Sequence, residues 1–268
     1  MWLSGPMPSE YPTTALELRS TLTDDGVITL AIRGADVADP GDDHVVVRVE
    51  AAPINPSDLG MMFAGGDPSA GLPAGDGIHD AVAVPVTEAA VAAQRARLGK
   101  PMPVGNEGGG VVVAAGSSPA AQALLGKTVG FLSGNAYAQY RTLHVSQCLP
   151  MADGTDPADA AAAFVNPLTA LGMVETMRSE GHTALVHTVG ASNLGLMLNR
   201  ICIDDGVGLV NIVRKPEHVE LLRSLGAVHV VDSSAESFID DLTDALRATG
   251  ATIAFDAIGG GDLASILL

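Results

Sequence analysis

The segment from Leu185 to Leu196 constrains the fold of this chain more than any other part of its sequence. A short apolar run ends at Val189 and leads into Gly190-Ala191-Ser192-Asn193-Leu194-Gly195, after which apolar residues recur with helical spacing. This order predicts a buried strand, a tight turn and the start of a helix. Backbone N–H groups at a helix start have no partner within the helix, and the helix dipole favours negative charge there.

The glycines of this loop have the spacing of a diphosphate-binding turn. Gly190 and Gly195 match the pattern G-x-G-x-x-G, which departs here only at its middle glycine, where Ser192 stands. We therefore predict that the loop from Gly190 to Gly195 binds a diphosphate, with N–H groups offered by Ser192, Asn193 and Leu194. A strand–turn–helix without any ligand has the same spacing, so the prediction depends on the neighbouring sequence.

Strands and helices alternate after this loop. Residues 208–213, 228–232 and 251–258 are expected to form strands, and residues 217–225 and 238–248 to form helices. The connections between these segments are short. This alternation predicts a parallel sheet with helices on both of its faces.

Basic residues follow the second of these strands. In a doubly wound sheet this position meets the adenosine ribose, where an acidic residue suits NAD and basic residues suit the phosphate of NADP. The chain has Arg214 and Lys215 there, and His218 lies one helical turn further on. The sequence therefore predicts NADP as the cofactor. Two solvated cations on a surface loop are the alternative.

Charge and composition limit the partners of the chain. The 268 residues are 47% hydrophobic, which allows a sizeable core in one large or two modest domains. A formal net charge of −17 repels phosphate backbones and anionic membrane surfaces, and an aromatic content of 3% leaves few platforms for stacking bases. We expect a small-molecule partner, not nucleic acid or a membrane.

The cysteines and the apolar segments indicate the cellular compartment of the protein. Cys148 and Cys202 are far apart in sequence, which fits a reduced protein. No apolar run approaches the length of a membrane span, and the N-terminal sequence does not have the pattern of an export signal. These observations predict a cytoplasmic protein.

The first half of the chain has short strand patterns bounded by glycine, proline or serine. The candidate strands are residues 14–18, 27–32, 44–52, 111–115, 128–132 and 136–143. They predict a compact, mostly antiparallel barrel. An alanine-rich helix is expected over residues 158–164, so we place the junction near residue 152. The predicted domains are residues 1–152 and 153–268.

Five motifs in order resemble the medium-chain dehydrogenase/reductase superfamily, in its zinc-free branch of quinone oxidoreductases and 2-enoyl thioester reductases. These motifs are residues 51–58, 105–108, 136–140 and 166–170, and the Gly190 loop. The resemblance implies a GroES-like catalytic domain, a Rossmann domain and an active site in the cleft between them. It also implies a homodimer, because relatives often dimerise through the nucleotide-domain sheet.

The ligand inventory argues against zinc. Zinc-dependent relatives place a cysteine near residues 55–58 and a histidine before the glutamate at 107, where this chain has Asn106. Catalytic zinc needs about three protein ligands, and His44, His79 and His144 show no metal spacing. We therefore expect no metal. Without a metal, we expect hydride transfer from the dihydronicotinamide to an already electrophilic acceptor, a quinone or a similar conjugated carbonyl compound.

By resemblance, further residues are expected near the cofactor. Asn166 and Thr169 are expected near the nicotinamide and its ribose, and Asn55 on the cofactor side of the cleft. Ile258 and Gly259 end the fourth strand, where the family passes close to the nicotinamide. The alternatives are an ordinary Asn-Pro turn at Asn55 and a helix-capping or packing role for Asn166.

The sequence names no proton donor. Mitochondrial-type enoyl reductases have a tyrosine shortly after residues 57–58, and this chain has none between Tyr11 and Tyr137. This departure favours a quinone over a thioester. A 2-enoyl thioester reductase and a catalytically silent nucleotide-binding protein remain the alternatives.

Two further features are unusual for the family. Residues 61–104 form an insertion rich in glycine, proline and alanine, with a helix predicted after the N-cap Thr87. It is expected either to cover the cleft or to lie on the remote surface. A complete member would carry roughly a hundred more residues to finish a six-stranded sheet, so a Rossmann domain incomplete at its C-terminus is expected.

Overall fold

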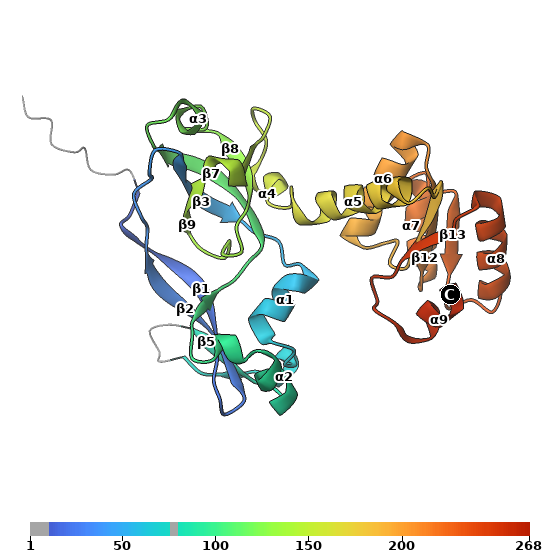
Figure 1. Cartoon of the computed structure of the whole chain (residues 1–268), viewed down its shortest axis with the longest axis horizontal. Coiled ribbons are helices and arrows are strands. Elements are labelled where there is room, and N and C mark those ends of the chain that lie inside the picture. Colours follow the sequence, from blue (N-terminus) through green and yellow to red (C-terminus); the bar gives the residue numbers. More distant parts are fainter. Residues whose placement is uncertain (1–10, 76–79) are drawn as a thin grey trace, which may run out of the picture. The chain divides into compact units, whose positions relative to one another are not determined.

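The computed structural model describes residues 11–75 and 80–268, and the chain divides into two compact units, Met1–Val165 and Asn166–Leu268 (Figure 1). The division lies after Val165, further along the chain than the junction predicted near residue 152. The reason is that α4 (Pro157–Ala160) packs on the first unit. A side chain at Gly109 would collide with the carbonyl of Pro157, at 2.2 Å.

The first unit consists of two antiparallel five-stranded sheets, with strand orders β4-β5-β2-β1-β6 and β10-β8-β7-β3-β9. The strands are β1 (Thr14–Leu22), β2 (Val27–Asp36), β3 (His44–Ala51), β4 (Leu72–Pro73), β5 (Ala81–Pro85), β6 (Met102–Pro103), β7 (Glu107–Ala115), β8 (Thr128–Leu132), β9 (Tyr140–His144) and β10 (Cys148–Pro150). The helices besides α4 are α1 (Pro56–Phe63), α2 (Glu88–Ala93) and α3 (Pro119–Gln122), with short 3-10 turns η1 (Pro68–Ala70), η2 (Arg95–Arg97) and η3 (Val145–Gln147).

The core of this unit follows from alternation along its strands. Val45 and Val47 of β3 pack with Val129 and Phe131 of β8, and each of these side chains is fully buried. Residues two apart on a strand face the same side, so one face of each strand supplies the core. The curled antiparallel sheets confirm the predicted barrel-like fold.

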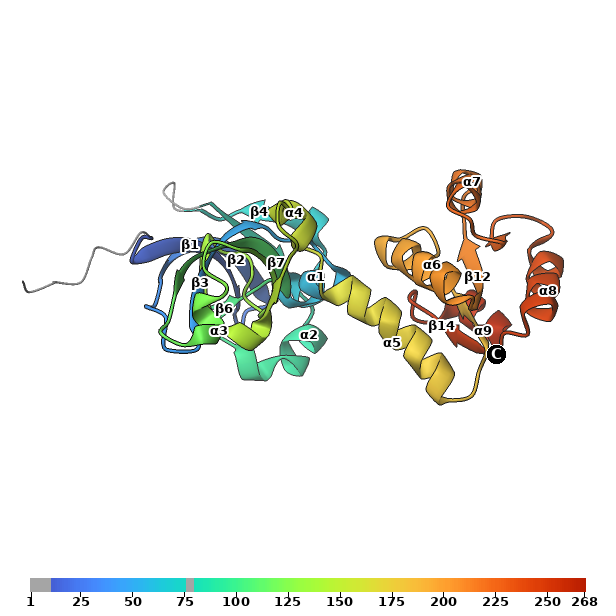
Figure 2. The same cartoon turned by 90° about the horizontal axis from the view of Figure 1, so that it is seen from above.

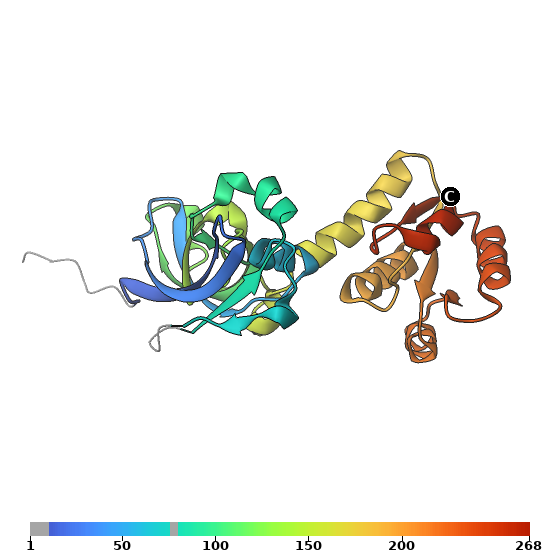
Figure 3. The same cartoon turned by 90° about the horizontal axis from the view of Figure 1, so that it is seen from below.

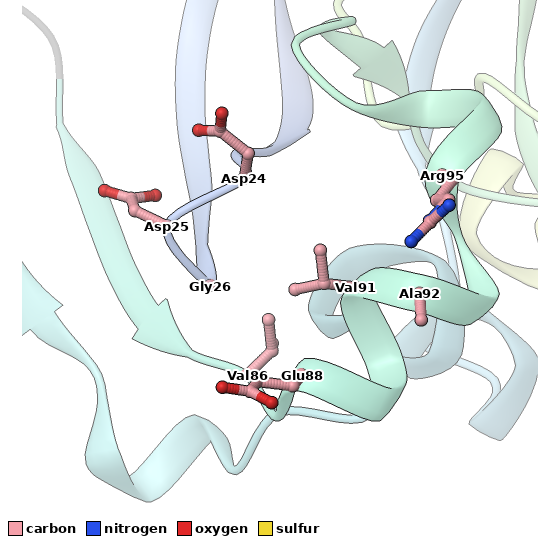
Figure 4. Close-up of a pocket in the computed structure, with 8 residues that line it drawn as sticks. All are labelled: Asp24, Asp25, Gly26, Val86, Glu88, Val91, Ala92 and Arg95. Atoms are coloured by element: carbon pink, nitrogen blue, oxygen red, sulfur yellow. The ribbon is translucent and has the colours of Figure 1, made fainter.

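The segment 61–104 is more than a loop with a helix. Its strands β5 and β6 pair with β2 and β1, so the segment completes one of the two sheets. The predicted helix α2 is present, and the Thr87 hydroxyl accepts a hydrogen bond from Ala90 N. A cavity of about 260 Å³ lies between α2 and the β1–β2 turn, where Asp24 and Asp25 stand opposite Arg95 (Figure 4). The strands β5 and β6 were not predicted from the sequence because they are short and contain proline.

The second unit is a parallel four-stranded sheet in the order β13-β12-β11-β14. Its strands are β11 (Ala184–His187), β12 (Gly208–Val213), β13 (His229–Asp232) and β14 (Ile253–Phe255). Its helices are α5 (Val165–Ser179), which begins at the last residue of the first unit, α6 (Asn193–Asp205), α7 (Pro216–Ser224), α8 (Phe238–Thr249) and α9 (Gly261–Leu267). Among the residues that the structure describes, no helix is long and apolar enough to cross a membrane.

Helices cover both faces of this sheet (Figures 2 and 3). Leu185 faces α5 and α6, whereas the next residue, Val186, packs with residues of α8 and α9. Consecutive strand residues point to opposite faces, so a strand buried on both sides is apolar throughout. This arrangement confirms the predicted fold class. The helix predicted over residues 158–164 is wrong in extent, because α4 ends at Ala160 and α5 begins only at Val165.

Candidate functional site

The loop between β11 and α6 is built on two glycines that tolerate no side chain. A Cβ at Gly195 would lie 2.3 Å from the carbonyl oxygen of Gly190. A Cβ at Gly190 would lie 2.8 Å from Cβ of Asn211 on β12. Ser192 is the N-cap of α6, and its hydroxyl accepts a hydrogen bond from Gly195 N at 3.1 Å. The close packing holds the helix start against the ends of β11 and β12.

The backbone amides of this loop divide into bonded and free groups. Gly190 N donates to Ile212 O at 3.0 Å, and Ser192 N donates to Val189 O at 2.9 Å. Within residues 11–75 and 80–268, the N–H groups of Ala191, Asn193 and Leu194 have no hydrogen-bond partner. The amides of Asn193 and Leu194, two of the three predicted diphosphate donors, are therefore not used within the described part of the chain. The Ser192 amide is used inside the turn, and Ala191 offers one in its place.

A cavity of about 380 Å³ lies at the carboxyl ends of the strands of the second unit. It is lined by Thr188, Val189, Ala191, Ser192, Val213, Arg214, His218, Ser233, Ile258 and Leu263. Five of these residues are predicted cofactor contacts: Ala191, Ser192, Arg214, His218 and Ile258. Ligands of open parallel sheets bind at this edge. The fold thus brings the loop, the β12 end and the β14 end to one cavity.

Arg214 and Lys215 differ in their surroundings. Arg214 lines the cavity, is exposed, and has no ion-pair or hydrogen-bond partner in the described part of the chain. Lys215 does not line the cavity, and its Nζ lies 3.8 Å from Oε1 of Glu217. Only one of the two predicted cations is therefore directed to the cavity with its charge unpaired.

The loop after β14 forms another part of the cavity wall. The Asp256 carboxylate accepts hydrogen bonds from Ile258 N (2.9 Å), Gly259 N (3.1 Å) and Gly260 N (2.8 Å), and from the hydroxyl of Thr188 (3.1 Å). These donors, the amides of Gly260 and Ile258 foremost, hold the pKa of Asp256 below its usual value. Sequence reasoning missed both Thr188 and Asp256, although the glycine run 259–261 was a signal for an organised turn.

A buried polar pair lies on β11 and β12. His187 and Asn211 are paired in register and fully buried. His187 Nδ1 lies 3.3 Å from Phe255 O, and Asn211 Nδ2 donates to Asn199 Oδ1 at 3.2 Å. Burial lowers the pKa of His187, so the imidazole is held in its neutral form.

The first unit contains a buried cluster of polar side chains formed by Asn55, Asp58 and Glu107. Glu107 and Asp58 are both 0% exposed. Asn55 Nδ2 donates to Glu107 Oε1 at 3.0 Å, and Asn55 N donates to Asp58 Oδ2 at 2.8 Å. The second oxygen of Asp58 accepts from Asn106 N at 2.9 Å. The predicted cofactor residue Asn55 is thus buried and bonded to both carboxylates.

Glu107 also caps α5. Its Oε2 accepts hydrogen bonds from Phe164 N and Val165 N, each at 2.9 Å. A carboxylate at a helix N-terminus satisfies free amides and complements the helix dipole. Two other predicted cofactor residues follow on this helix: Asn166, which is half-buried, and Thr169, which is exposed. Glu107 therefore caps the start of α5 at the residue before Asn166.

Tyr137 lies beside this cluster. Its hydroxyl donates to Pro53 O at 2.8 Å. Burial raises the pKa of Tyr137 well above its usual value, and the nearby carboxylates Asp58 and Glu107 raise it further. The phenol therefore keeps its proton, which is already engaged with the backbone.

The rings of His44 and His144 meet edge to face at 5.3 Å, and His79 lies outside the described residues. In the part of the chain that the structure describes, no group of three or more His, Cys, Asp or Glu side chains could hold a metal ion. Cys148 and Cys202 are free, and burial raises the pKa of each thiol to about 11.

Comparisons with known proteins agree with the fold. A crystal structure from Mesorhizobium loti, assigned as an NADPH:quinone reductase, is 28% identical, with a TM-score of 0.69 over 96% of this chain and 71% of that chain. Escherichia coli quinone oxidoreductase complexed with NADPH is 17% identical, with a TM-score of 0.65 over 94% of this chain and 68% of that one. The comparison with the Escherichia coli protein bears on the fold alone.

A curated relative is the mitochondrial enoyl-[acyl-carrier-protein] reductase of Xenopus tropicalis. It is 27% identical over 216 residues, which are 75% of this chain and 51% of that protein. This chain therefore spans about half the length of that relative. No family model matches the chain.

The two units correspond to a GroES-like unit followed by a Rossmann unit. The solved structures and the curated relative that the chain is similar to are quinone reductases and an enoyl reductase, which are the classes of the medium-chain dehydrogenase/reductase superfamily that its motifs resemble.

Proposed function

We propose that this chain is the NADPH-binding part of a zinc-independent reductase that reduces a quinone or a similar conjugated carbonyl compound. The observation that carries the proposal is the cavity of the second unit. It is lined by Ala191, whose amide has no partner in the described part of the chain, and by Arg214, whose guanidinium is unpaired; the free amides of Asn193 and Leu194 follow at the start of α6. Amides at a helix start suit a diphosphate, and a guanidinium suits the phosphate that distinguishes NADP from NAD.

The residues fit the cofactor group by group. Ala191, Asn193 and Leu194 would offer N–H groups to the diphosphate, and Gly190 and Gly195 keep that surface free of side chains. Arg214, with His218 beside it in the cavity lining, would hold the ribose phosphate. The dihydronicotinamide supplies the hydride when it is bound. The protein contributes binding, orientation and exclusion of competing reactions.

The resemblance to the Mesorhizobium loti protein supports a quinone-like acceptor. A quinone is already electrophilic, and its oxygens can take protons from water. The reaction then needs no dedicated acid residue, which agrees with a Tyr137 hydroxyl that is engaged with Pro53 O.

A second candidate is a 2-enoyl thioester reductase. The observation that favours it is the identity to the Xenopus tropicalis enoyl reductase over three quarters of this chain. This reaction requires protonation of the carbon next to the thioester carbonyl.

A panel of acceptors separates the two candidates. The purified chain would be mixed with NADPH and either a quinone or crotonyl thioester, and the NADPH absorbance followed with time. Oxidation with the quinone alone supports the first proposal, and oxidation with the thioester alone supports the second. Binding without oxidation of NADPH by either acceptor would identify a silent nucleotide-binding protein.

Arg214→Ala tests the cofactor assignment, with Lys215→Ala as its matched control. A charge-assisted hydrogen bond contributes about 1.5–3 kcal/mol, so Arg214→Ala should weaken NADPH binding roughly 10- to 100-fold. NADH binding should change little. Lys215→Ala removes an equal charge next to the cavity and should have a much smaller effect. Equal losses of NADPH and NADH affinity in Arg214→Ala would contradict the phosphate assignment.

A further inference from the structure

Ordering the loop that follows β14 carries a large cost in backbone conformational entropy. Gly259, Gly260 and Gly261 have φ values of +86°, +114° and +77°. An added Cβ at any of them would meet no atom within 4 Å, so the backbone conformation, and not crowding, requires glycine. Three successive glycines lose more conformational freedom on ordering than other residues would. Some interaction must offset that loss.

The Asp256 carboxylate accepts the hydrogen bonds that hold this loop in its conformation. It accepts three backbone N–H groups of the loop and the hydroxyl of Thr188 on the neighbouring segment after β11. The Thr188 hydroxyl in turn accepts a hydrogen bond from Ala257 N at 3.0 Å. Hydrogen bonds to a charged acceptor are about twice as strong as neutral ones. The Thr188–Asp256 pair thus fastens the loop to the end of β11.

The fastened loop presents Ile258 to the cavity. Ile258 lines the same cavity as Arg214, although its side chain is 59% exposed. β14 and β12 lie on opposite sides of β11. The loop is therefore two strand spacings, roughly 10 Å, from the end of β12. If Arg214 holds the adenosine ribose and the start of α6 holds the diphosphate, the other half of the dinucleotide extends toward Ile258.

We propose that the Thr188–Asp256 pair is a positioning device that holds Ile258 as the apolar wall for the nicotinamide half of the cofactor. The inference rests on the proposed function for the identity of the ligand. Asp256 itself need not touch the ligand, because its oxygens are occupied by the loop. Asp256 keeps the loop with Ile258 ordered before the cofactor binds. The binding free energy therefore includes no cost of ordering this loop.

Asp256→Asn is the test, with Asp67→Asn as the matched control. Asp67 lies in the first unit and organises a turn in the same way, accepting from Ser69 N at 2.9 Å and Ser69 Oγ at 2.7 Å. Two ligands would be titrated: NADPH, and 2′,5′-ADP, which lacks the nicotinamide half. Amide hydrogen exchange of Ile258, Gly259 and Gly260 would report on the loop directly.

The expected result is selective. If the loop is formed in only a tenth of the Asp256→Asn molecules, the NADPH dissociation constant rises about tenfold, while that of 2′,5′-ADP changes less than about twofold. The three loop amides should exchange faster. Asp67→Asn should change none of these quantities. Thr188→Val should produce the same pattern more weakly, and Thr188→Ser, which keeps the hydroxyl, should behave like the unaltered chain.

Two outcomes would overturn the proposal. Equal weakening of NADPH and 2′,5′-ADP would mean that Asp256 supports only the fold of the unit. Unchanged exchange at the three amides would mean that the carboxylate does not hold the loop. Failure of the unaltered chain to bind NADPH would instead refute the proposed function. The exchange data would then still show whether Asp256 holds the loop.

Discussion

The buried cluster of the first unit and the cavity of the second unit differ in whether their polar groups have hydrogen-bond partners within the protein. Asp58 and Glu107 are fully buried, and their oxygens accept hydrogen bonds from donors of the same unit. In the cavity, the N–H group of Ala191 and the guanidinium of Arg214 have no partner in the described part of the chain. The comparison separates polar groups that stabilise a fold from polar groups available to a ligand.

The physical reason is the cost of burial. A charge that is removed from water must be paired and hydrogen-bonded, or the fold loses several kcal/mol. Donors at an accessible rim are solvated when no ligand is present, so leaving them unpaired costs little. An anion that replaces this water gains several charge-assisted bonds at once. The polar cluster of the first unit therefore stabilises the fold, whereas the cavity of the other unit is suited to an anion.

The largest expected effect is on the cluster of the first unit. Glu107→Ala leaves the donors Asn55 Nδ2, Phe164 N and Val165 N without an acceptor. We expect a loss of about 3–5 kcal/mol in the free energy of unfolding, measured with urea. Glu50→Ala is the control, because Glu50 makes an exposed ion pair with Arg48 and should contribute less than about 1 kcal/mol. Similar losses in the two variants would remove the distinction between the two regions.

A second test acts on the loop of the cavity. Gly195→Ala places a Cβ against the backbone of Gly190, which cannot move without displacing the helix start. We expect about 1–3 kcal/mol of destabilisation and NADPH binding weakened by roughly tenfold or more. Gly172→Ala in α5 is the control, since a Cβ there meets nothing and should stabilise the helix by about 0.5–1 kcal/mol. Unimpaired NADPH binding by Gly195→Ala would show that the loop is not the diphosphate site.

A third test uses pH. Burial lowers the pKa of His187 below its ordinary value of 6.5. Below that pH the unfolded chain binds a proton that the folded chain does not, so stability falls as pH falls from about 6.5. His187→Gln should lose less stability than the unaltered chain between pH 7 and pH 5 in urea titrations. A pH dependence that is identical in both proteins would contradict the assignment.

The smallest expected effect compares two helix caps. Ser192 in the cavity and Thr87 in the first unit each accept a hydrogen bond from the amide three residues on. Replacing either by alanine should cost about 1 kcal/mol of stability. Only Ser192 lines the 380 Å³ cavity, so only Ser192→Ala should also weaken NADPH binding, by a few-fold. An equal change in NADPH affinity for Thr87→Ala would mean that the two units are coupled in binding.

Much of the second unit could be predicted because its signals are local. The apolar run before Gly190, the glycine spacing and the cap Ser192 lie within a dozen residues, and each acts on its immediate neighbours. The same holds for Thr87 and α2. The strands β5 and β6 were missed, since each is stabilised by pairing with a distant strand and not by its own composition.

The sequence alone determined which segments are apolar, where the helix start with its glycine loop falls, and that basic residues follow β12. Only the tertiary structure decided that Arg214 lines the cavity while Lys215 lies by Glu217, that Glu107 caps a helix 58 residues away, and that Asp256 holds the loop bearing Ile258. Backbone propensity and hydrophobic periodicity act over a few residues. Hydrogen-bond partners are chosen by proximity in space, and that proximity exists only once the sheets have formed.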